Sequence, residues 1–447
     1  MTTEQLSSER PTRFRWVVFT LCSATSWLLY LHRYVFGLIK AELDDEYDLG
    51  ETKLGLLDSG FSLFYSTCQI PMGVAVDVYG AYAMLTGMIV VWSVGLGLHA
   101  WAPTPDHLWY GRATMGTGQS GVFAGLSRIS KNWFPPSART TLQGWMGVFF
   151  GRTGGMCANL LIGSLVLGVL EVPWRTAVFG LTIVGLLHAV IFATLYRNSP
   201  ANHPRVNKAE LELIQQGEDA GDTAKRFGFR EMFSRMTPRS IRNLFTLNTQ
   251  MILSATADSI FSAWIPMFLV KVHGLEFKEM GIYASLPLLG GALGGAAGGW
   301  LNDVMIRRTG SRRWARSTVG FAGKAIAGCL LLAALLWYDD PYKFCSMLFF
   351  VKFFSDWSLS TTWGAVTDIG GRATATVFAF NNAVGTIGAV MAPALFGAIA
   401  EHASWRLVFV TGAVTYLLCA ISWLPFNCTI PVVDEEQSTP SWTAPGS

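Results

Sequence analysis

The sequence predicts an all-helical protein that crosses a membrane twelve times, with its helices arranged in two bundles of six. Of its 447 residues, 51% are hydrophobic and only 14% are charged, and the mean hydropathy is +0.36. Soluble proteins average about 25% charged residues. The apolar segments have about the 20 residues that a helix needs to cross a bilayer core. They lack the alternation and the short length of barrel strands, which leaves helices as the spanning elements.

Twelve apolar segments follow one another along the chain. The first six are residues 14–39, 54–76, 82–102, 107–130, 141–169 and 174–196, and the second six are 243–270, 279–302, 317–338, 343–367, 373–400 and 404–426. Taken with their short connections, they predict bundles over residues 14–196 and 243–426, joined by a central cytoplasmic loop over 197–242. Residues 1–13 form a cytoplasmic N-terminus. Residues 427–447 are rich in Pro, Ser, Thr and Glu, which predicts a disordered cytoplasmic tail.

The distribution of Lys and Arg predicts the orientation. With a cytoplasmic N-terminus, 20 Lys and Arg lie in the inner segments, 7 lie in the outer loops and 6 lie within the spans. This asymmetry follows the positive-inside rule, so we expect both termini on the cytoplasmic side of the inner, or plasma, membrane. The first apolar segment is too long for a cleavable signal peptide.

An internal repeat supports two halves of parallel topology. Gly73 and Asp77 close the second span as Gly-x-x-x-Asp, and Gly299 and Asp303 close the eighth span in the same way, 226 residues later. The pair Trp174-Arg175 recurs as Trp405-Arg406 after 231 residues. Two such halves are typical of a secondary transporter that rocks them around a midplane site. A scaffold or sensor without cargo is the alternative.

Several classes of function lack their motifs. A phosphate-binding Gly-x-x-x-x-Gly-Lys-[Ser/Thr] loop is absent, and the seven histidines form no His-Glu-x-x-His motif. The seven cysteines show no metal-ligand spacing and are expected in the helix core. We therefore expect no enzyme activity, cofactor or metal, no nucleic-acid partner, and a monomer whose partners are the lipid bilayer, a small solute and a coupling ion.

The charges within the spans predict the sign of that solute. Each charge at this depth costs several kcal/mol unless it has a partner or a role. The first six spans carry Arg33, Arg112, Arg128 and Arg152 against Asp58 alone, and the last six carry Lys324 and Lys352 against Asp258 and Asp356. The N-terminal half therefore has an excess of three positive charges, which an anionic substrate would offset.

Not every arginine is expected to bind that substrate. Arg128 lies near the inner end of its span, where it can reach the surface. Arg152 lies within a glycine-rich stretch, where gating or capping of backbone carbonyls is as good an explanation as substrate contact. Arg33 and Arg112 remain as the leading ligands, and pairing with Asp58 is their structural alternative.

The C-terminal half offers an internally balanced set of charges. Lys352 and Asp356 are four residues apart on one helix face and can neutralise each other. Asp258 has no partner on its own helix, so it either pairs with Lys324 or titrates. Whether Lys324, Lys352 and Arg152 are structural or functional stays open.

Short motifs in a fixed order give the chain a family resemblance. These are Tyr30-Leu31-His32-Arg33, Gln69-Ile70-Pro71 with Gly73, Gly111-Arg112, Trp133-Phe134-Pro135, His203-Pro204 with Asn207 and Glu210, Trp264-Ile265-Pro266, Asp303 with Arg307-Arg308 and Arg312-Arg313, and Asp368 to Arg372 leading to Asn382. The chain resembles the major facilitator superfamily, and within it the anion:cation symporters such as hexuronate, glucarate and galactonate permeases and sialin. The resemblance covers nearly the whole chain.

This resemblance implies roles for particular residues. Arg33 and Arg112 match arginines implicated in carboxylate binding and gating. Tyr65 matches a cavity-facing tyrosine, and Asn382 matches an asparagine that contacts the sugar. Gln119 completes the set of candidate substrate-binding residues. The implied function is secondary transport of a small organic anion, most simply a sugar acid, by alternating access.

Two departures from the family pattern concern the coupling ion. His32 stands where proton-coupled members commonly have an aspartate, and Gln119 stands where they have a glutamate. Proton symport is the first expectation, with His32, Asp258 and Asp356 as candidate carriers and Arg152 as a gating candidate. Sodium symport and uniport are the alternatives.

Two further features compare with the family. Gly73, Asp77, Gly299 and Asp303 match its conformational motif, although Val78, Ala81 and Tyr82 replace expected basic residues. The first motif also resembles organophosphate:phosphate antiporters, which makes sugar-phosphate transport the runner-up. Those proteins have an arginine at the position of Asp258, whose charge we expect to repel a phosphate.

Overall fold

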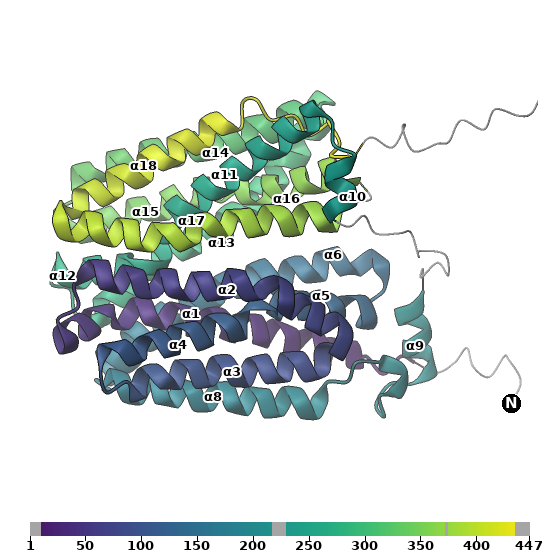
Figure 1. Cartoon of the computed structure of the whole chain (residues 1–447), viewed down its shortest axis with the longest axis horizontal. Coiled ribbons are helices and arrows are strands. Elements are labelled where there is room, and N and C mark those ends of the chain that lie inside the picture. Colours follow the sequence, from purple (N-terminus) through teal and green to yellow (C-terminus); the bar gives the residue numbers. More distant parts are fainter. Residues whose placement is uncertain (1–9, 217–228, 372–373, 434–447) are drawn as a thin grey trace, which may run out of the picture.

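The computed structural model describes residues 10–216, 229–371 and 374–433, and these form helices, turns and loops without a β-strand. The outer parts of the predicted termini, part of the predicted central loop and Arg372 lie outside the described residues. Figure 1 shows two helical bundles side by side, with their helices along the long axis of the molecule. The prediction of an all-helical fold is confirmed.

The N-terminal bundle contains the first eight helices. They are α1 (Phe14–Tyr47), α2 (Gly50–Tyr79), α3 (Ala81–Trp101), α4 (Pro105–Ser120), α5 (Val122–Trp133), α6 (Pro136–Gly144), α7 (Phe150–Cys157) and α8 (Trp174–Leu195), with π-helical segments at Trp145–Phe149 and Ala158–Val169. The short helices α9 (Lys208–Gln215) and α10 (Phe229–Ser234) lie in the connection to the second bundle.

The C-terminal bundle contains the remaining helices. They are α11 (Pro238–Ala263), α12 (Ile265–Lys271), α13 (Phe277–Thr309), α14 (Arg312–Ala334), α15 (Pro341–Ser355), α16 (Trp357–Gly370), α17 (Thr374–His402) and α18 (Trp405–Ser422). Each predicted span corresponds to one helix or to consecutive helices. Eight described spans are long and apolar enough to cross a membrane, or nine when the bent pair α11 and α12 is included.

Three spans that the sequence predicts as continuous are broken. The fourth breaks at Gly121, the seventh at Trp264 and the tenth at Asp356. Helices α11 and α12 meet at a bend of 45°, where Pro266 in the first turn of α12 has no N–H to donate. Broken helices near mid-depth commonly line the substrate site of a transporter, and these breaks adjoin the charges described below.

The connection between the bundles also fixes the start of α1. The carboxylate of Glu210, fully buried on α9, accepts hydrogen bonds from the backbone N–H groups of Phe14 and Arg15 at 2.9 and 3.0 Å. These amides belong to the first turn of α1, whose positive dipole end favours a carboxylate. The Phe14 ring stacks on His203, and burial lowers the pKa of that histidine.

The structure corrects the start of the predicted tail. Residues 427–433 pack against the C-terminal bundle. Val432 N–H donates to the carbonyl of Ile369, and Ser240 Oγ donates to the carbonyl of Pro431 at 2.7 Å. The polar composition of the tail predicted disorder from residue 427. However, Cys428, Val432 and Val433 join a buried cluster with Trp423. Residues 434–447 lie outside the described residues.

The two bundles touch near one end of the molecule, which we call the distal end, where α1 leads into α2. Lys271 of α12 pairs with Asp44 and lies 3.6 Å from Glu51, while Thr52 N–H donates to Glu401 of α17. In the described part of the chain, the hydrogen bonds and ion pairs between bundles extend from this end to Arg152. The opposite end, with Arg10 and residues 427–433, is called the terminal end.

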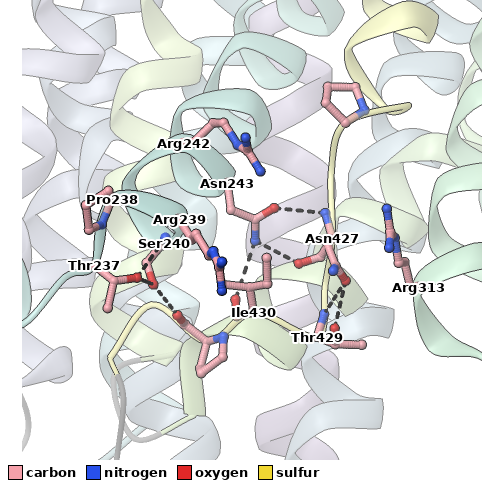
Figure 2. Close-up of a pocket in the computed structure, with 12 residues that line it drawn as sticks. Thr237, Pro238, Arg239, Ser240, Arg242, Asn243, Arg313, Asn427, Thr429 and Ile430 are labelled. Atoms are coloured by element: carbon pink, nitrogen blue, oxygen red, sulfur yellow. Dashed lines mark hydrogen bonds between the residues drawn. The ribbon is translucent and has the colours of Figure 1, made fainter.

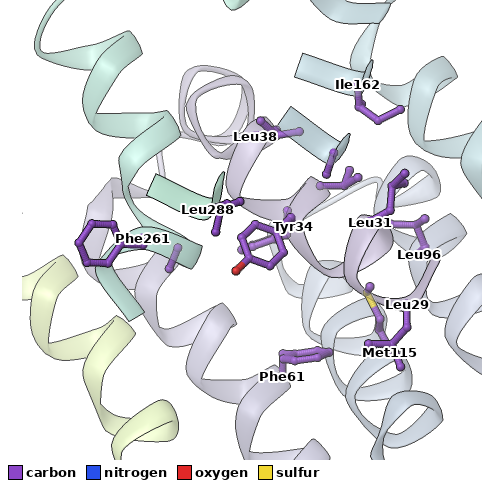
Figure 3. Packing of buried hydrophobic residues seen from close by; sticks show 14 of the residues in the cluster. Leu29, Leu31, Tyr34, Leu38, Phe61, Leu96, Met115, Ile162, Phe261 and Leu288 are labelled. Carbon is purple, nitrogen blue, oxygen red and sulfur yellow. The ribbon is translucent and has the colours of Figure 1, made fainter. Parts of the chain in front are cut away.

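Apolar packing at mid-depth is shared by both bundles. Leu29, Tyr34 and Phe61 of the first bundle and Phe261 and Leu288 of the second belong to one buried cluster, shown in Figure 3. The bundles therefore meet through a packed interface as well as through charges.

A glycine stripe on α13 lets α15 and α16 approach closely. A Cβ atom at Gly290, Gly294 or Gly298 would overlap the backbone of Phe349, Phe353 or Trp357 respectively. Small residues in such stripes let membrane helices pack backbone to backbone. The stripe therefore packs α13 against α15 and α16.

Gly294→Ala is expected to lower the free energy of unfolding by about 1–3 kcal/mol, because the added methyl group overpacks a rigid backbone contact. Gly180→Ala on α8 is the matched control, since a Cβ there meets nothing within 4 Å. Thermal unfolding of both variants in detergent is the measurement. An equal midpoint for Gly294→Ala and Gly180→Ala would contradict the assignment.

Candidate functional site

Arg33 lies near the middle of α1 in a pocket of aromatic rings. Its guanidinium carbon is 5.1, 5.1 and 4.8 Å from the ring centroids of Tyr30, Phe61 and Tyr65. Such stacking attracts a cation through the ring quadrupole. Arg33 Nε donates to Gln119 Oε1 at 3.0 Å. The predicted residues Arg33, Tyr65 and Gln119 are therefore brought together.

The guanidinium of Arg33 has no carboxylate partner among the residues that the structure describes. Its Nη2 is buried and donates to no described group. Gln119 Nε2 donates to the Leu29 carbonyl at 3.2 Å, which turns the amide oxygen toward Arg33 and fixes the arginine without neutralising it. A guanidinium offers five donors in a planar fork, so Arg33 retains donors suited to a carboxylate.

Arg112 differs from Arg33 in its surroundings. Its side chain is only 2% exposed, and its Nη2 pairs with Asp58 Oδ1 at 2.5 Å while Nε donates to the Leu57 carbonyl at 3.2 Å. Arg112 therefore shows the alternative expected from the sequence, which is pairing with Asp58. Its guanidinium carbon lies 4.6 Å from the Phe61 ring, which Arg33 also contacts. Arg112 therefore supports the wall of the Arg33 pocket in this conformation.

Lys40 is a buried cation that lies one residue beyond the predicted first span, 14–39. Helix α1 continues to Tyr47, and Lys40 Nζ lies 2.5 Å from Asp58 Oδ2 and 2.9 Å from the Ala263 carbonyl of α11. The same ammonium lies 3.7 Å from the Trp264 ring centroid. Its spacing of seven residues from Arg33 was the available signal, because that spacing places both on one helix face.

The C-terminal bundle holds a network around Asp258. Asp258 Oδ1 accepts hydrogen bonds from Lys352 Nζ at 2.6 Å and from the Tyr416 hydroxyl at 2.7 Å. Lys324 Nζ lies 3.9 Å from Asp258 Oδ2 and donates to Ser254 and Ser355, each at 2.8 Å. Lys324, the expected partner of Asp258, is therefore close to it, and Lys352, expected beside Asp356, contacts Asp258 as well. The sequence did not indicate Tyr416 and the two serines as members of this network, because none of the three carries a formal charge.

Asp356 joins the two bundles at mid-depth. Its Oδ1 accepts from Lys352 at 2.7 Å on its own side, and its Oδ2 lies 2.7 Å from Arg152 Nη2 of the other bundle. Asp356 is 2% exposed, and its carboxylate lies against Gly291, where a Cβ would come within 2.6 Å of Oδ2. The pair Lys352–Asp356 was predicted, whereas Arg152 as its third member was not.

Counted together, the mid-depth charges are unbalanced. The set comprises six cations and three carboxylates, for a net charge of +3: Arg33, Lys40, Arg112, Arg152, Lys324 and Lys352 against Asp58, Asp258 and Asp356. Arg128 is not part of it, because it pairs with Asp77 at 3.2 Å near the terminal end, with both side chains exposed. Lys40 replaces Arg128 in the set of mid-depth charges, so the excess of three positive charges is the same although one of the residues differs.

His32 points away from the Arg33 pocket. Its side chain is fully buried, and a Cβ at Gly185 of α8 would lie 2.9 Å from His32 Cε1. Neither ring nitrogen has a hydrogen-bond partner among the described residues. His32 as a carrier of the coupling proton stays a prediction, and its ring lies against α8 and not in the Arg33 pocket.

Among the described residues, no hydrogen bond or ion pair joins the remaining predicted residues to this cluster. Asn382 is half-buried on α17, and its backbone carbonyl accepts a hydrogen bond from Thr386. The two motif glycines have equivalent surroundings, since a Cβ at Gly73 or Gly299 would meet only a single neighbouring residue, at 3.8 Å. Asp77 and Asp303 are exposed at the terminal end of their helices.

Comparison with known proteins places the chain in a family. It is 28% identical over 410 residues to a probable sulfoacetate transporter of Cupriavidus necator, covering 91% of this chain and 92% of that protein. It is 26% identical over 410 residues to a probable galactarate/D-glucarate transporter of Bacillus subtilis, with 87% and 86% covered. A D-galactonate transporter of Escherichia coli is 23% identical over 428 residues, with 94% and 97% covered.

Solved structures show the same architecture. A bacterial homolog of the human lysosomal transporter Spinster aligns with TM-scores of 0.72 in its unoccupied form and 0.74 in its occupied form. The identities are 18% and 17%, and 92% of this chain and 96% of that chain are covered in each case. Residues 22–375, most of the chain, match the description of one family of membrane transporters. This chain belongs to the Major Facilitator Superfamily.

Proposed function

We propose that this protein is a secondary transporter of a small organic anion, with the substrate carboxylate held by Arg33. The observation that carries the proposal is a mid-depth guanidinium with no carboxylate partner among the described residues, set in a group of charges with a net excess of +3. A charge at this depth requires a partner or a function. An anionic solute supplies that partner when it enters.

A sugar acid is the substrate class that we propose first. Relatives that align over most of this chain are named for galactarate, D-glucarate, D-galactonate and hexuronate. Such a solute has at least one carboxylate for Arg33, with two in galactarate and D-glucarate, and a hydroxyl-rich body for polar groups, among which we propose Asn382. Tyr30, Phe61 and Tyr65 would give the apolar face of the sugar chain a surface to pack on.

A solute that carries a phosphate or sulfonate group is the second candidate, favoured by the net charge of +3. The expected repulsion of phosphate by Asp258 does not stand, because Lys352 and Lys324 already surround that carboxylate. Sulfoacetate, named for the relative from Cupriavidus necator, and a sugar phosphate both belong in this class.

A thermal-shift panel separates these classes. We expect purified protein to be stabilised by D-galactonate, D-glucarate or a hexuronate, since a ligand at 100 times its dissociation constant adds about 2.7 kcal/mol. Stabilisation by glycerol 3-phosphate or sulfoacetate alone would move the assignment to phosphates or sulfonates. A folded protein that none of these acids stabilises would contradict an organic-anion site.

The bundles would alternate around the bridge between Arg152 and Asp356. We propose that the distal contacts of Lys271 and Glu401 close one face of the transporter in this conformation, and that the terminal end faces the cytoplasm. The excess of Lys and Arg at the terminal end supports this orientation in a plasma membrane. Opening the distal face requires these ion pairs to separate.

Proton symport is the proposed coupling, with Asp356 as the proton-binding group. Protonation would remove the charge that attracts Arg152 and so release the bridge between bundles. The N-terminal pocket offers no alternative beside Arg33, because Gln119 does not titrate and His32 faces α8. Sodium symport and uniport are the other outcomes of the test.

His32→Ala is expected to leave proton-driven uptake intact, because the side chain lies outside the Arg33 pocket. The measurement is uptake in proteoliposomes under separately imposed proton and sodium gradients, with the unsubstituted protein as the control. Loss of proton-driven accumulation with counterflow retained would return the carrier role to His32. Accumulation that follows only the sodium gradient would overturn proton coupling.

A further inference from the structure

A second polar cavity lies at the terminal end of the C-terminal bundle, away from the mid-depth charges. It has a volume of about 770 Å³ and is lined by the first turns of α11, by Arg313 at the start of α14 and by the segment after α18. Figure 2 shows Arg239 and Arg242 on α11 and Arg313 to either side of that segment. This cavity is separate from the Arg33 pocket.

The charges around this cavity are all of one sign. Arg239, Arg242 and Arg313 line it, and none of its twelve lining residues is Asp or Glu. Arg239, Arg242 and Arg313 form no ion pair among the described residues. By contrast, the nearby Arg312 and Arg316 share Asp368, at 3.8 and 3.1 Å. The cavity therefore concentrates uncompensated positive charge beside arginines that are already paired.

Internal hydrogen bonds hold the wall of the cavity in place. Asn243 Nδ2 donates to the Asn427 carbonyl at 2.8 Å, and Asn427 N–H donates back to Asn243 Oδ1 at the same distance (Figure 2). Ser240 Oγ donates to the Pro431 carbonyl at 2.7 Å. The wall satisfies its own polar groups and leaves the three guanidinium groups for a ligand.

Exposed apolar side chains neighbour the lining residues along the chain. Ile241 and Phe245 are four residues apart on one face of α11 and are 52% and 71% exposed. Leu424 precedes the lining segment and is 56% exposed. Ile241 lies between Arg239 and Arg242, and Phe245 lies one turn further in, so this end of α11 combines basic and exposed apolar residues. Such a combination is expected at the boundary between headgroups and hydrocarbon.

We propose that this cavity binds the phosphate of an anionic phospholipid, with the acyl chains along Ile241 and Phe245. Basic pockets between transmembrane helices on the cytoplasmic side favour acidic headgroups, and guanidinium groups bind phosphate through paired hydrogen bonds. A free phosphate would use the same arginines but gain nothing from the apolar side chains. The proposal is independent of the substrate carried at Arg33.

Lipid titration of the full-length protein in detergent, followed by native mass spectrometry, tests this site. Phosphatidylglycerol is expected to bind, and phosphatidylethanolamine, which has no net charge, is expected to bind at least tenfold more weakly. The variant R239Q/R242Q/R313Q should lose at least tenfold in affinity for phosphatidylglycerol. The control R205Q/R307Q/R308Q removes three exposed arginines outside the cavity and should bind as the unsubstituted protein does.

Two further variants show whether the bound phosphate belongs to a lipid and whether the glutamine variant loses binding only because it unfolds. I241S/F245S should weaken phosphatidylglycerol binding and leave any glycerol 3-phosphate binding unchanged. R239K/R242K/R313K, which keeps the charge, should retain part of the affinity if the glutamine variant unfolds. Equal affinity in the glutamine and control triples would overturn the proposal. So would inorganic phosphate that binds as tightly as the lipid, because it would assign the cavity to a free anion.

Discussion

Arg33→Ala is expected to weaken binding of the organic anion by roughly 10- to 150-fold. The change removes charge-assisted hydrogen bonds of about 1.5–3 kcal/mol. Because Arg33 has no carboxylate partner among the described residues, its loss leaves no buried carboxylate behind. The unliganded protein loses only the contacts with Gln119 and the three rings, so its stability should fall less than in Arg112→Ala. Calorimetric titration with the acid found in the thermal-shift panel measures the affinity, and thermal unfolding measures the stability.

Arg112→Ala provides the matched control within the same bundle. It breaks a buried ion pair with Asp58, and removing one partner of such a pair costs about 3–5 kcal/mol. Lys40 remains beside Asp58, which places the expected loss at the lower end. The two variants should therefore differ in kind, with Arg33→Ala losing affinity and Arg112→Ala losing stability. Unchanged affinity in a folded Arg33→Ala protein would refute the site.

Asp356→Asn is expected to abolish proton-driven accumulation while counterflow of substrate continues. The asparagine keeps the shape of the side chain but carries no charge and cannot exchange a proton. It also leaves Arg152 without its carboxylate, so we expect a loss of about 3–5 kcal/mol in stability. Uptake in proteoliposomes under an imposed proton gradient, compared with counterflow in the same vesicles, gives the readout.

A double variant separates the bridge from general destabilisation. Arg152→Gln combined with Asp356→Asn removes both charges, so its effect should be smaller than the sum of the single effects. Asp339→Asn, which breaks the exposed pair with Arg406, is the surface control and should change little. Additive effects of Arg152→Gln and Asp356→Asn would contradict the bridge. Proton-driven accumulation that survives Asp356→Asn would move coupling to another group.

The helical architecture could be predicted because length and hydropathy determine which segments can cross a membrane. Each predicted apolar segment coincides with one helix or with consecutive helices. The breaks at Gly121, Trp264 and Asp356 were missed, since an average over a segment does not register where a single turn lacks hydrogen bonds. Lys40 was missed for a related reason. A charged residue lowers the average hydropathy, so the predicted span ends before Lys40 although α1 continues to Tyr47.

The candidate site could be predicted only in part. The positive excess follows from counting charges along the chain, whereas the difference between Arg33 and Arg112 does not, because it depends on the contact of Arg112 with Asp58. The partners of these charges depend on contacts between helices that are distant in sequence, as in the pairing of Asp356 with Arg152. From spacing along the chain, the only partner that could be predicted for Asp356 was Lys352, four residues earlier. The orientation of His32 toward α8 depends on how α1 rotates in its bundle, which its apolar pattern did not resolve.

The central claim is that this protein exchanges an organic anion across a membrane through Arg33, and counterflow in proteoliposomes tests it most directly. Vesicles loaded with unlabelled D-galactonate, D-glucarate or a hexuronate are diluted into the same labelled acid, without any imposed ion gradient. The account predicts saturable uptake of at least one of these acids by the unsubstituted protein and its loss in Arg33→Ala. Undiminished exchange by Arg33→Ala, or no exchange of any acid by the folded protein, would contradict it.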